Sequence, residues 1–171
     1  MRNFFLTTAR LGFSHWHPDD RPLAHRLWGD PEVTRLIVQG GVMTAAQIDA
    51  RLADEIARQD TYGIQYFPLF RLADGQFAGC CGLRPWPGPE EALELGFHLR
   101  PAFWRQGYAH EAAAAMIGYA FRILHAPALI AGHHPDNHRS QALLARLGFV
   151  HLRDDFYPPT GRYHPTYRLL P

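Results

Sequence analysis

The sequence contains few cysteines, no strong charge bias and no long apolar run. Its 171 residues include two cysteines and carry a formal net charge of +1 at pH 7. The cysteines are neighbours, Cys80 and Cys81, which excludes a framework of several disulfides and favours a reducing compartment such as the cytoplasm. The near-neutral charge excludes an electrostatic drive toward nucleic acid or an anionic membrane surface. The sequence shows neither an apolar run long enough to span a bilayer nor a secretory signal at its start. We therefore expect no membrane association.

Composition and periodicity predict one mixed α/β domain. Hydrophobic residues make up 47% and charged residues 19%, which fits a single globular domain over residues 1–171. Apolar and alternating runs predict strands over residues 6–16, 64–72, 76–83, 92–99, 128–132, 150–157 and 163–170. Helical spacing predicts helices over residues 19–29, 30–37, 44–59, 110–124 and 140–147. This order predicts a mixed sheet with helices on its faces.

Local signals support several of these elements. Thr44 and Gln47 fit a capping box at the start of the third helix. Asp74-Gly75, between two apolar runs, predicts a hairpin. Gly148 fits the position just after a helix C-terminus. The helix over residues 110–124 carries a continuous apolar stripe, which makes it the clearest element of the chain.

The segment Trp104-Arg105-Gln106-Gly107-Tyr108-Ala109 joins a predicted strand to a helix N-terminus. Such a junction exposes unpaired backbone N–H groups at the positive end of the helix dipole, and it therefore favours an anion such as a phosphate. Gly107 lets a ligand approach the backbone closely, and Arg105 adds a cation. The segment lacks the Lys-Ser/Thr ending of a P-loop and the glycine spacing of a dinucleotide fingerprint. On its own it also fits a turn that only reverses the chain.

Polar residues flank this turn on both sides. In the strand before it, Glu94 and His98 share the face opposite the apolar residues, because side chains alternate along a strand. After the long helix, Asn137 and Ser140 lie at the entry to the next helix, where Ser140 is expected to be the N-cap. These residues are the first candidates for a site beside the turn.

Seven segments match one family in order along nearly the whole chain. They are LTTARL (6–11), GDPEVT (29–34), GCCGL (79–83), LELGF (93–97), WRQGYAHEA (104–112), NHRS (137–140) and LGF (147–149). Together they resemble the GNAT superfamily of acyl-CoA-dependent N-acetyltransferases, in particular its branch similar to ribosomal-protein alanine acetyltransferases. The resemblance implies an α/β (α+β) GNAT fold: a mixed, mostly antiparallel sheet, splayed between its fourth and fifth strands, with helices on both faces.

The resemblance also implies how acetyl-CoA binds. Its pyrophosphate rests on the backbone N–H groups of residues 105–109, and its pantetheine arm lies in the splay along a bulged strand at residues 97–99. The implied cofactor-binding residues are Phe97, His98, Leu99, Trp104, Arg105, Gln106, Gly107, Tyr108, Ala109, Asn137 and Ser140. Trp104 stands where the family signature has Gln or Arg, so the backbone rather than a signature side chain is expected to hold the pyrophosphate.

The implied reaction is direct attack of a neutral primary amine, on a protein N-terminus or a small molecule, on the thioester of acetyl-CoA through a tetrahedral intermediate. Glu94 is the candidate general base; alternatively it pairs with an arginine and only positions the substrate. A backbone N–H of residues 97–99 is the candidate donor to the oxyanion. The alternative function is an acyl-CoA-binding module without catalysis. Relatives in this family are often homodimers, which makes a homodimer possible here.

The resemblance leaves the general acid open. Many relatives have a tyrosine in the helix after Asn137, but this chain has no tyrosine between Ser140 and Phe149. Ser140 is the leading replacement, with a plain helix cap as its alternative role. His98 and Tyr157 are weaker candidates.

Histidine is abundant, with 11 residues in the chain. His133, His134 and His138 share one loop but lack a cysteine partner or the HExxH spacing of a zinc site. No metal is therefore expected, and a polar loop at the substrate mouth is favoured. An aromatic group nearer the start of the chain is expected either to line the acceptor side of the site or to be partly buried. Its members are His15, Trp16, His17 and Trp28.

Overall fold

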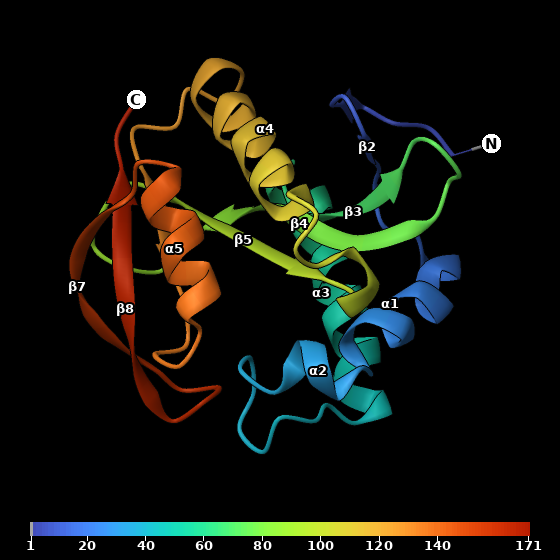
Figure 1. Cartoon of the computed structure of the whole chain (residues 1–171), viewed down its shortest axis with the longest axis horizontal. Coiled ribbons are helices and arrows are strands. Elements are labelled where there is room, and N and C mark those ends of the chain that lie inside the picture. Colours follow the sequence, from blue (N-terminus) through green and yellow to red (C-terminus); the bar gives the residue numbers. More distant parts are fainter. Residues whose placement is uncertain (1) are drawn as a thin grey trace.

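The computed structural model describes residues 2–171, which form a sheet with helices on both faces (Figure 1). Within these residues the sheet has eight strands in the order β1-β2-β3-β4-β5-β6-β8-β7. The strands are β1 (Leu6–Thr7), β2 (Leu11–Phe13), β3 (Tyr66–Arg71), β4 (Phe77–Pro85), β5 (Leu93–Leu99), β6 (Leu129–Gly132), β7 (Val150–Tyr157) and β8 (Arg162–Leu169). The helices are α1 (Arg21–Trp28), α2 (Pro31–Thr34), α3 (Ala45–Tyr62), α4 (Tyr108–Arg122) and α5 (His138–Arg146).

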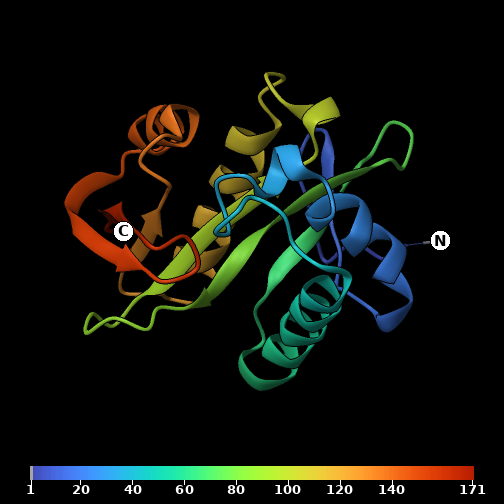
Figure 2. The same ribbon diagram turned by 90° about the horizontal axis from the view of Figure 1, so that it is seen from below.

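Two apolar clusters pack on opposite faces of the sheet, beneath the helices that Figure 2 shows on either side. On one face, α4 and α5 bury Met116 and Leu144. On the other, α1 and α3 bury Leu27 and Leu52. The apolar stripe predicted over residues 110–124 is the side of α4 that faces the sheet. These two layers hold the strands rigidly between them.

The sheet is mixed, and its β5–β6 pair is parallel while every other neighbouring pair within residues 2–171 is antiparallel. These two strands pair only at Leu93–Leu129 and Glu94–Ile130 and then separate. The predicted splay is therefore confirmed. The fourth and fifth expected strands are β5 and β6 in the structure, because the first expected strand, over residues 6–16, is two strands, β1 and β2. The bulge expected in β5 is wrong, since the described β4–β5 pairing continues in register from Pro85–Leu93 to Gly79–Leu99. The gap opens because β6 alone diverges.

The expected strand over residues 6–16 is instead a pair of short strands folded back on each other. β1 and β2 pair Leu6 with Phe13. The turn between them is anchored on Glu111 of α4, which accepts from Thr8 Oγ1 (2.6 Å) and Arg10 Nε (2.6 Å). A contact with a helix about a hundred residues away thus decides where the chain turns.

The helix ends differ modestly from the prediction, and the local signals are confirmed. The capping box of Thr44 and Gln47 starts α3, which runs beyond residue 59 to a left-handed Gly63 (φ 69°). α2 ends at Thr34 rather than at residue 37. The hairpin between β3 and β4 forms at Asp74-Gly75.

Cys80 and Cys81 are both free and buried in β4, as predicted. Burial raises the pKa of the Cys80 thiol to about 12, so the thiol is protonated at neutral pH. Among residues 2–171, no helix is both long and apolar enough to cross a membrane.

The carboxylate of Glu55 on α3 is fully buried and joins this helix to β3. It accepts hydrogen bonds from Arg51 Nε (2.8 Å), Arg58 Nη1 (2.7 Å) and the backbone N–H of Tyr66 (2.9 Å). Trp16 Nε1 donates to the carbonyl of Tyr66 (2.6 Å). The start of β3, and with it Tyr66, is therefore held from both sides.

Replacing Glu55 with alanine is expected to lower the free energy of unfolding by about 3–5 kcal/mol, because two guanidinium groups and the Tyr66 N–H lose their acceptor. Urea denaturation measures this loss. Asp60→Ala, which removes an exposed acid from the same helix, is the control and should change the stability by less than about 0.5 kcal/mol. Equal stabilities of the two variants would contradict the role given to Glu55.

Candidate functional site

Two cavities meet in the cleft between β5 and α5. The first, here the turn cavity, has a volume of about 470 Å³ and borders the segment 103–110. The second, here the Glu94 cavity, has a volume of about 330 Å³ and borders Tyr66, Arg84 and Glu94. The residues lining both cavities are Leu36, Ile37, Phe97, His98, Asn137 and Ser140. A ligand in one cavity can therefore reach a ligand in the other at this junction.

The turn before α4 has the backbone shape of an anion site. Arg105 (φ 60°) and Gly107 (φ 81°) both adopt the left-handed conformation. Within residues 2–171, the backbone N–H groups of residues 105–109 donate to no protein acceptor. These donors lie at the N-terminus of α4, where the helix dipole favours negative charge.

The shape of this turn is held by Arg10 and Glu111. Arg10 Nη1 donates to the carbonyl of Gln106 (2.9 Å), while its Nε and backbone N–H donate to Glu111 (2.6 and 2.9 Å). Burial alone would raise the pKa of Glu111, but hydrogen bonds from Thr8 and Arg10 lower it overall, so the carboxylate stays ionised. The turn is thus preformed. The sequence pattern pointed to the turn but not to this brace, which joins segments far apart in the chain.

The side chains of the turn divide into two groups. Arg105, Tyr108 and Ala109 line the turn cavity together with the backbone of Gly107. The Gln106 side chain instead donates back to the carbonyl of Ala102 (2.7 Å) and lines neither of the two described cavities. Only the backbone N–H of Gln106 is available to a ligand.

Arginines give the turn cavity a positive surface. Arg35, Arg105, Arg139 and Arg146 line it, against the single carboxylate of Glu32. The guanidinium of Arg139 also lies 5.6 Å from the ring centre of Trp104, whose indole N–H donates to the carbonyl of Leu99 (2.7 Å). Such a set fits a ligand with several phosphates. The arginines outside the turn were not predicted, although the seven-residue spacing of Arg139 and Arg146 places both on one helix face.

The register of β5 decides which backbone groups face the gap. Arg100 N–H donates to the carbonyl of Ala78, and Trp86 N–H donates to that of Ala92. Since hydrogen-bonded pairs alternate along an antiparallel ladder, even-numbered residues of β5 bond to β4 and odd-numbered ones face away. The backbone groups of Phe97 and Leu99 therefore face the gap. Those of His98 face β4, and His98 reaches the cavities through its side chain.

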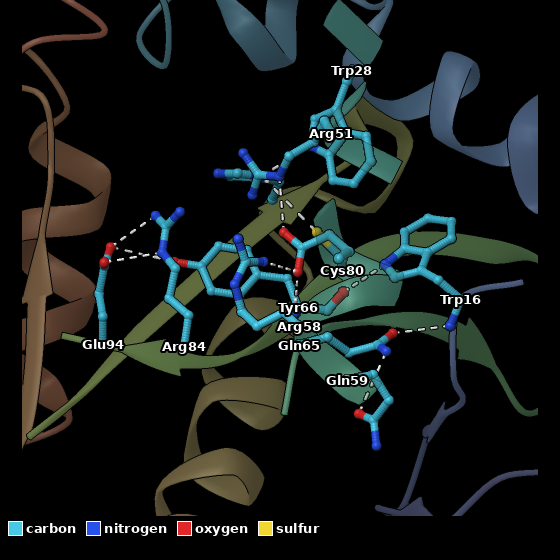
Figure 3. A network of polar contacts seen from close by, with 12 residues as sticks. Trp16, Trp28, Arg51, Arg58, Gln59, Gln65, Tyr66, Cys80, Arg84 and Glu94 are labelled. Carbon is cyan, nitrogen blue, oxygen red and sulfur yellow. Dashed lines mark hydrogen bonds and ion pairs between the residues drawn. The ribbon is translucent and has the colours of Figure 1, made fainter. Parts of the chain in front are cut away.

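Glu94 is paired with an arginine, which is one of the two arrangements that the sequence left open. Arg84 donates from Nε and Nη2 to the two oxygens of Glu94, each at 3.0 Å. The Tyr66 hydroxyl also donates to Glu94 (3.3 Å), and Figure 3 shows these three side chains side by side. Burial raises the pKa of Tyr66 well above its usual value, so its hydroxyl stays protonated.

Gly96 lies opposite Tyr66 on the same face of β5 as Glu94. A Cβ at this position would overlap the hydroxyl and ring of Tyr66. Gly96→Ala is therefore expected to lower the free energy of unfolding by about 1–3 kcal/mol through overpacking. Gly132→Ala is the matched strand control, because its nearest neighbours would be 3.5 Å away. Equal melting temperatures of the two variants would contradict this close approach.

Asn137, not Ser140, caps α5, so the predicted cap is wrong. Asn137 Oδ1 accepts from the backbone N–H of Ser140 (3.1 Å). Asparagine and serine cap helices about equally well, and α5 starts two residues earlier than predicted, at His138. The Ser140 hydroxyl is thereby released from capping and lies at the junction of the two cavities.

Besides His98, three histidines line the Glu94 cavity: His133, His134 and His164. Burial lowers the pKa of each, that of His164 to about 4, so they are neutral at pH 7. Tyr157 lines the same cavity. In the part of the chain that the structure describes, no group of three or more His, Cys, Asp or Glu residues is arranged to hold a metal ion.

The aromatic group that was expected either at the acceptor side or partly buried lies outside the two described cavities. His15, Trp16, His17 and Trp28 line neither of the two described cavities. Trp16 and Trp28 are buried in the cluster under α1 and α3, where their rings pack at 5.5 Å. Trp28 nevertheless touches the site, because its indole N–H donates to His98 Nδ1 (3.1 Å).

Comparison with known proteins identifies relatives over most of the chain. The acetyltransferase (GNAT) domain family matches residues 10–150. FsC-acetyl coenzyme A-N(2)-transacetylase of Aspergillus fumigatus is 31% identical over 91% of this chain and 71% of its own. The structure of a GNAT-family acetyltransferase from Bacillus anthracis superposes with a TM-score of 0.81 at 21% identity, covering 98% of both chains. A ribosomal L7/L12 α-N-protein acetyltransferase in complex with coenzyme A has the same fold, with a TM-score of 0.80 at 13% identity over 98% of both chains.

Proposed function

Because the chain belongs to the GNAT family of acetyl-CoA-dependent N-acetyltransferases, we propose that it acetylates a primary amine, on a protein N-terminus or a small molecule, by direct attack on acetyl-CoA. The observation that carries this proposal is the junction of two unlike cavities on β5. One is lined by arginines and a turn with free backbone N–H groups, and the other by the carboxylates of Glu94 and Asp155 and by neutral histidines. A phosphate-bearing donor and an amine acceptor fit these two surfaces respectively.

The turn cavity is the proposed seat of acetyl-CoA. The free N–H groups of residues 105–109 would hold the pyrophosphate, with Arg105, Arg139 and Arg146 adding charge. The gap-facing carbonyl of Phe97 and the backbone groups of Leu99 would bond the pantetheine amides as a neighbouring strand would, which leaves the Phe97 N–H free. Asn137 and Ser140 then border the thioester at the junction.

Glu94 is the proposed base for the incoming amine. An attacking amine must be neutral, and the ordinary pKa of an α-amino group is about 7.7–8.0, against about 10.4 for a lysine side chain. Glu94 forms an ion pair with Arg84, and in the proposed reaction its carboxylate accepts the proton of the amine directly or through water. The same pair also fits the alternative role, in which Glu94 orients the ammonium group before it loses its proton.

Bond changes in this reaction can be assigned to residues at the junction. The amine nitrogen bonds to the acetyl carbon, and the backbone N–H of Phe97 donates to the resulting oxyanion. The carbon–sulfur bond then breaks, and the CoA thiolate takes a proton or leaves unprotonated. The Ser140 hydroxyl, free of capping, is the proposed hydrogen-bond donor to that sulfur.

An acyl-CoA-binding module without catalysis is the second candidate function. Trp104 at the signature position and the absence of a tyrosine between Ser140 and Phe149 favour it. The Glu94 cavity counts against it, because a module that only binds acyl-CoA has no use for a second, polar cavity at the junction.

Thiol release from acetyl-CoA in the presence of a panel of amines and N-terminal peptides separates the two functions. The chain contains no lysine, so acetylation of its own side-chain amines adds no background. Amine-dependent thiol release is expected. Acetyl-CoA binding by calorimetry, without amine-dependent release across the panel, would instead support the binding module.

A further inference from the structure

The imidazole of His98 is held in one orientation from the core side. Trp28 Nε1 donates to His98 Nδ1 (3.1 Å), and the Cys80 sulfur lies 3.9 Å from the same nitrogen. An indole N–H can only donate, so Nδ1 must be an acceptor. In a neutral ring the single proton is therefore on Nε2.

The surroundings of His98 keep the ring neutral. Burial, with the nearby guanidinium groups of Arg51 and Arg84, lowers the pKa of His98 well below its usual value. Arg51 is held in place by its hydrogen bond to Glu55. Its guanidinium carbon lies 5.0 Å from the centre of the Trp28 ring, and Figure 3 shows these two side chains side by side. The ring therefore presents a neutral Nε2–H donor rather than an imidazolium.

This donor is not used by the protein. Within residues 2–171, no side chain or backbone group accepts a hydrogen bond from His98 Nε2. Among those residues only two buried side-chain polar atoms lack a partner, Arg51 Nη2 and Asp155 Oδ2, so Nε2 of His98 is not sealed in the interior. Since His98 lines both cavities, its free N–H is available to a ligand at their junction.

The position of His98 on β5 determines which groups of the site lie next to its side chain. Glu94, Gly96 and His98 lie along one face of the strand, with Glu94 and His98 about 13 Å apart at about 3.3 Å per residue. The ring and hydroxyl of Tyr66 occupy the place between them that the absent side chain at Gly96 leaves. The N–H of Phe97, the proposed oxyanion donor, precedes His98 directly. In the proposed reaction the thioester therefore lies at the His98 end of this face, and the amine approaches it from the Glu94 cavity.

We propose that the Nε2–H of His98, oriented by Trp28, donates a second hydrogen bond to the thioester carbonyl oxygen as it becomes the oxyanion. This inference rests on the proposed acetyl transfer. His98 keeps its proton throughout: the carbonyl electron pair moves to oxygen when the amine bonds, and returns when the thiolate leaves. A neutral imidazole with a low pKa suits this task, because it polarises a carbonyl without giving up its proton.

Two substitutions of His98 test the donor. His98→Phe keeps a flat ring without a donor and is expected to lower kcat about 100-fold, the typical cost of one lost oxyanion donor, with the Kd for acetyl-CoA within about threefold. His98→Gln places an amide N–H near the Nε2 position and is expected to recover most of that loss. A kcat for H98F within threefold of wild type would overturn the proposal. So would a folded H98Q that is as slow as H98F.

The positioning role of Trp28 has a readout independent of turnover. Nitrogen NMR of ¹⁵N-histidine-labelled protein should show His98 protonated on Nε2. Trp28→Phe should yield a mixture of tautomers and a kcat about 10-fold lower. Trp16→Phe is the matched control, since Trp16 is buried in the same cluster but donates to the Tyr66 carbonyl. A wild-type His98 protonated on Nδ1, or a tautomer unchanged in W28F, would overturn the positioning.

Failure of the inference and failure of the proposed function are distinguishable. Wild-type protein without amine-dependent thiol release would overturn the proposed function and with it the role of His98. Wild-type turnover that survives His98→Phe overturns the inference alone.

Discussion

Replacing Gly107 with valine is expected to weaken acetyl-CoA binding at least about 100-fold, which corresponds to about 2.7 kcal/mol. Gly107 is left-handed (φ 81°), a conformation that a β-branched residue adopts only under strain. A Cβ there would also lie 3.3 Å from Arg10 Nη2, whose guanidinium braces the turn. The valine side chain would block the approach of the phosphates to the backbone N–H groups. It would also distort the turn that positions these groups.

Gly75→Val is the matched control for this substitution. Gly75 is also left-handed (φ 68°), and a Cβ there would meet no atom within 4 Å. Both variants should lose about 1–3 kcal/mol of stability from backbone strain, but only G107V should lose affinity in calorimetric titrations with acetyl-CoA. If G107V bound acetyl-CoA with wild-type affinity, the turn would not be part of the binding site.

Glu94→Gln is expected to lower kcat by about 100-fold or more, the typical contribution of a general base. The Kd for acetyl-CoA should stay within about threefold of wild type, because Glu94 lines only the Glu94 cavity. The amide preserves the shape of the carboxylate and one acceptor for Arg84. Steady-state kinetics with the best amine of the panel gives kcat and KM separately.

The split between these constants decides the role of Glu94. A raised KM for the amine with unchanged kcat would contradict the base and favour the positioning alternative. Glu90→Gln is the matched control, since Glu90 also pairs with an arginine, Arg153, but lines neither of the two described cavities. Both constants of E90Q should equal those of wild type.

Elements with strong local signals could be predicted from the sequence. The apolar stripe of α4 and the hairpin at Asp74-Gly75 depend on residues close together in the chain. The face shared by Glu94 and His98 follows from alternation along one strand. The splay between β5 and β6 was predicted through family resemblance, because no local pattern says where two parallel strands separate.

Features built from distant segments could not be predicted. The brace of Arg10 on Glu111 spans 101 residues and also decides why residues 6–16 fold back on themselves. Arg35 and Arg146 reach the turn cavity from segments far apart in the chain. Trp28 was expected either at the acceptor side or partly buried. It is buried in the core, and only the packed structure shows that its indole donates to His98.

The prediction of the residue that caps α5 failed for a different reason. Asn137 and Ser140 both suit an N-cap, and the free-energy difference between capping residues is only a few tenths of a kcal/mol. The loop that leads into the helix settles the choice, since the Asn137 N–H donates to the carbonyl of His134 (2.8 Å). That outcome frees the Ser140 hydroxyl for the junction.

A crystal structure of the protein with coenzyme A tests the central claim most directly. We expect the pyrophosphate oxygens within hydrogen-bond distance of the N–H groups of residues 105–109, with the sulfur at the junction beside Phe97 and His98. A pyrophosphate bound away from this turn, or a sulfur that does not reach the junction with the Glu94 cavity, would contradict it.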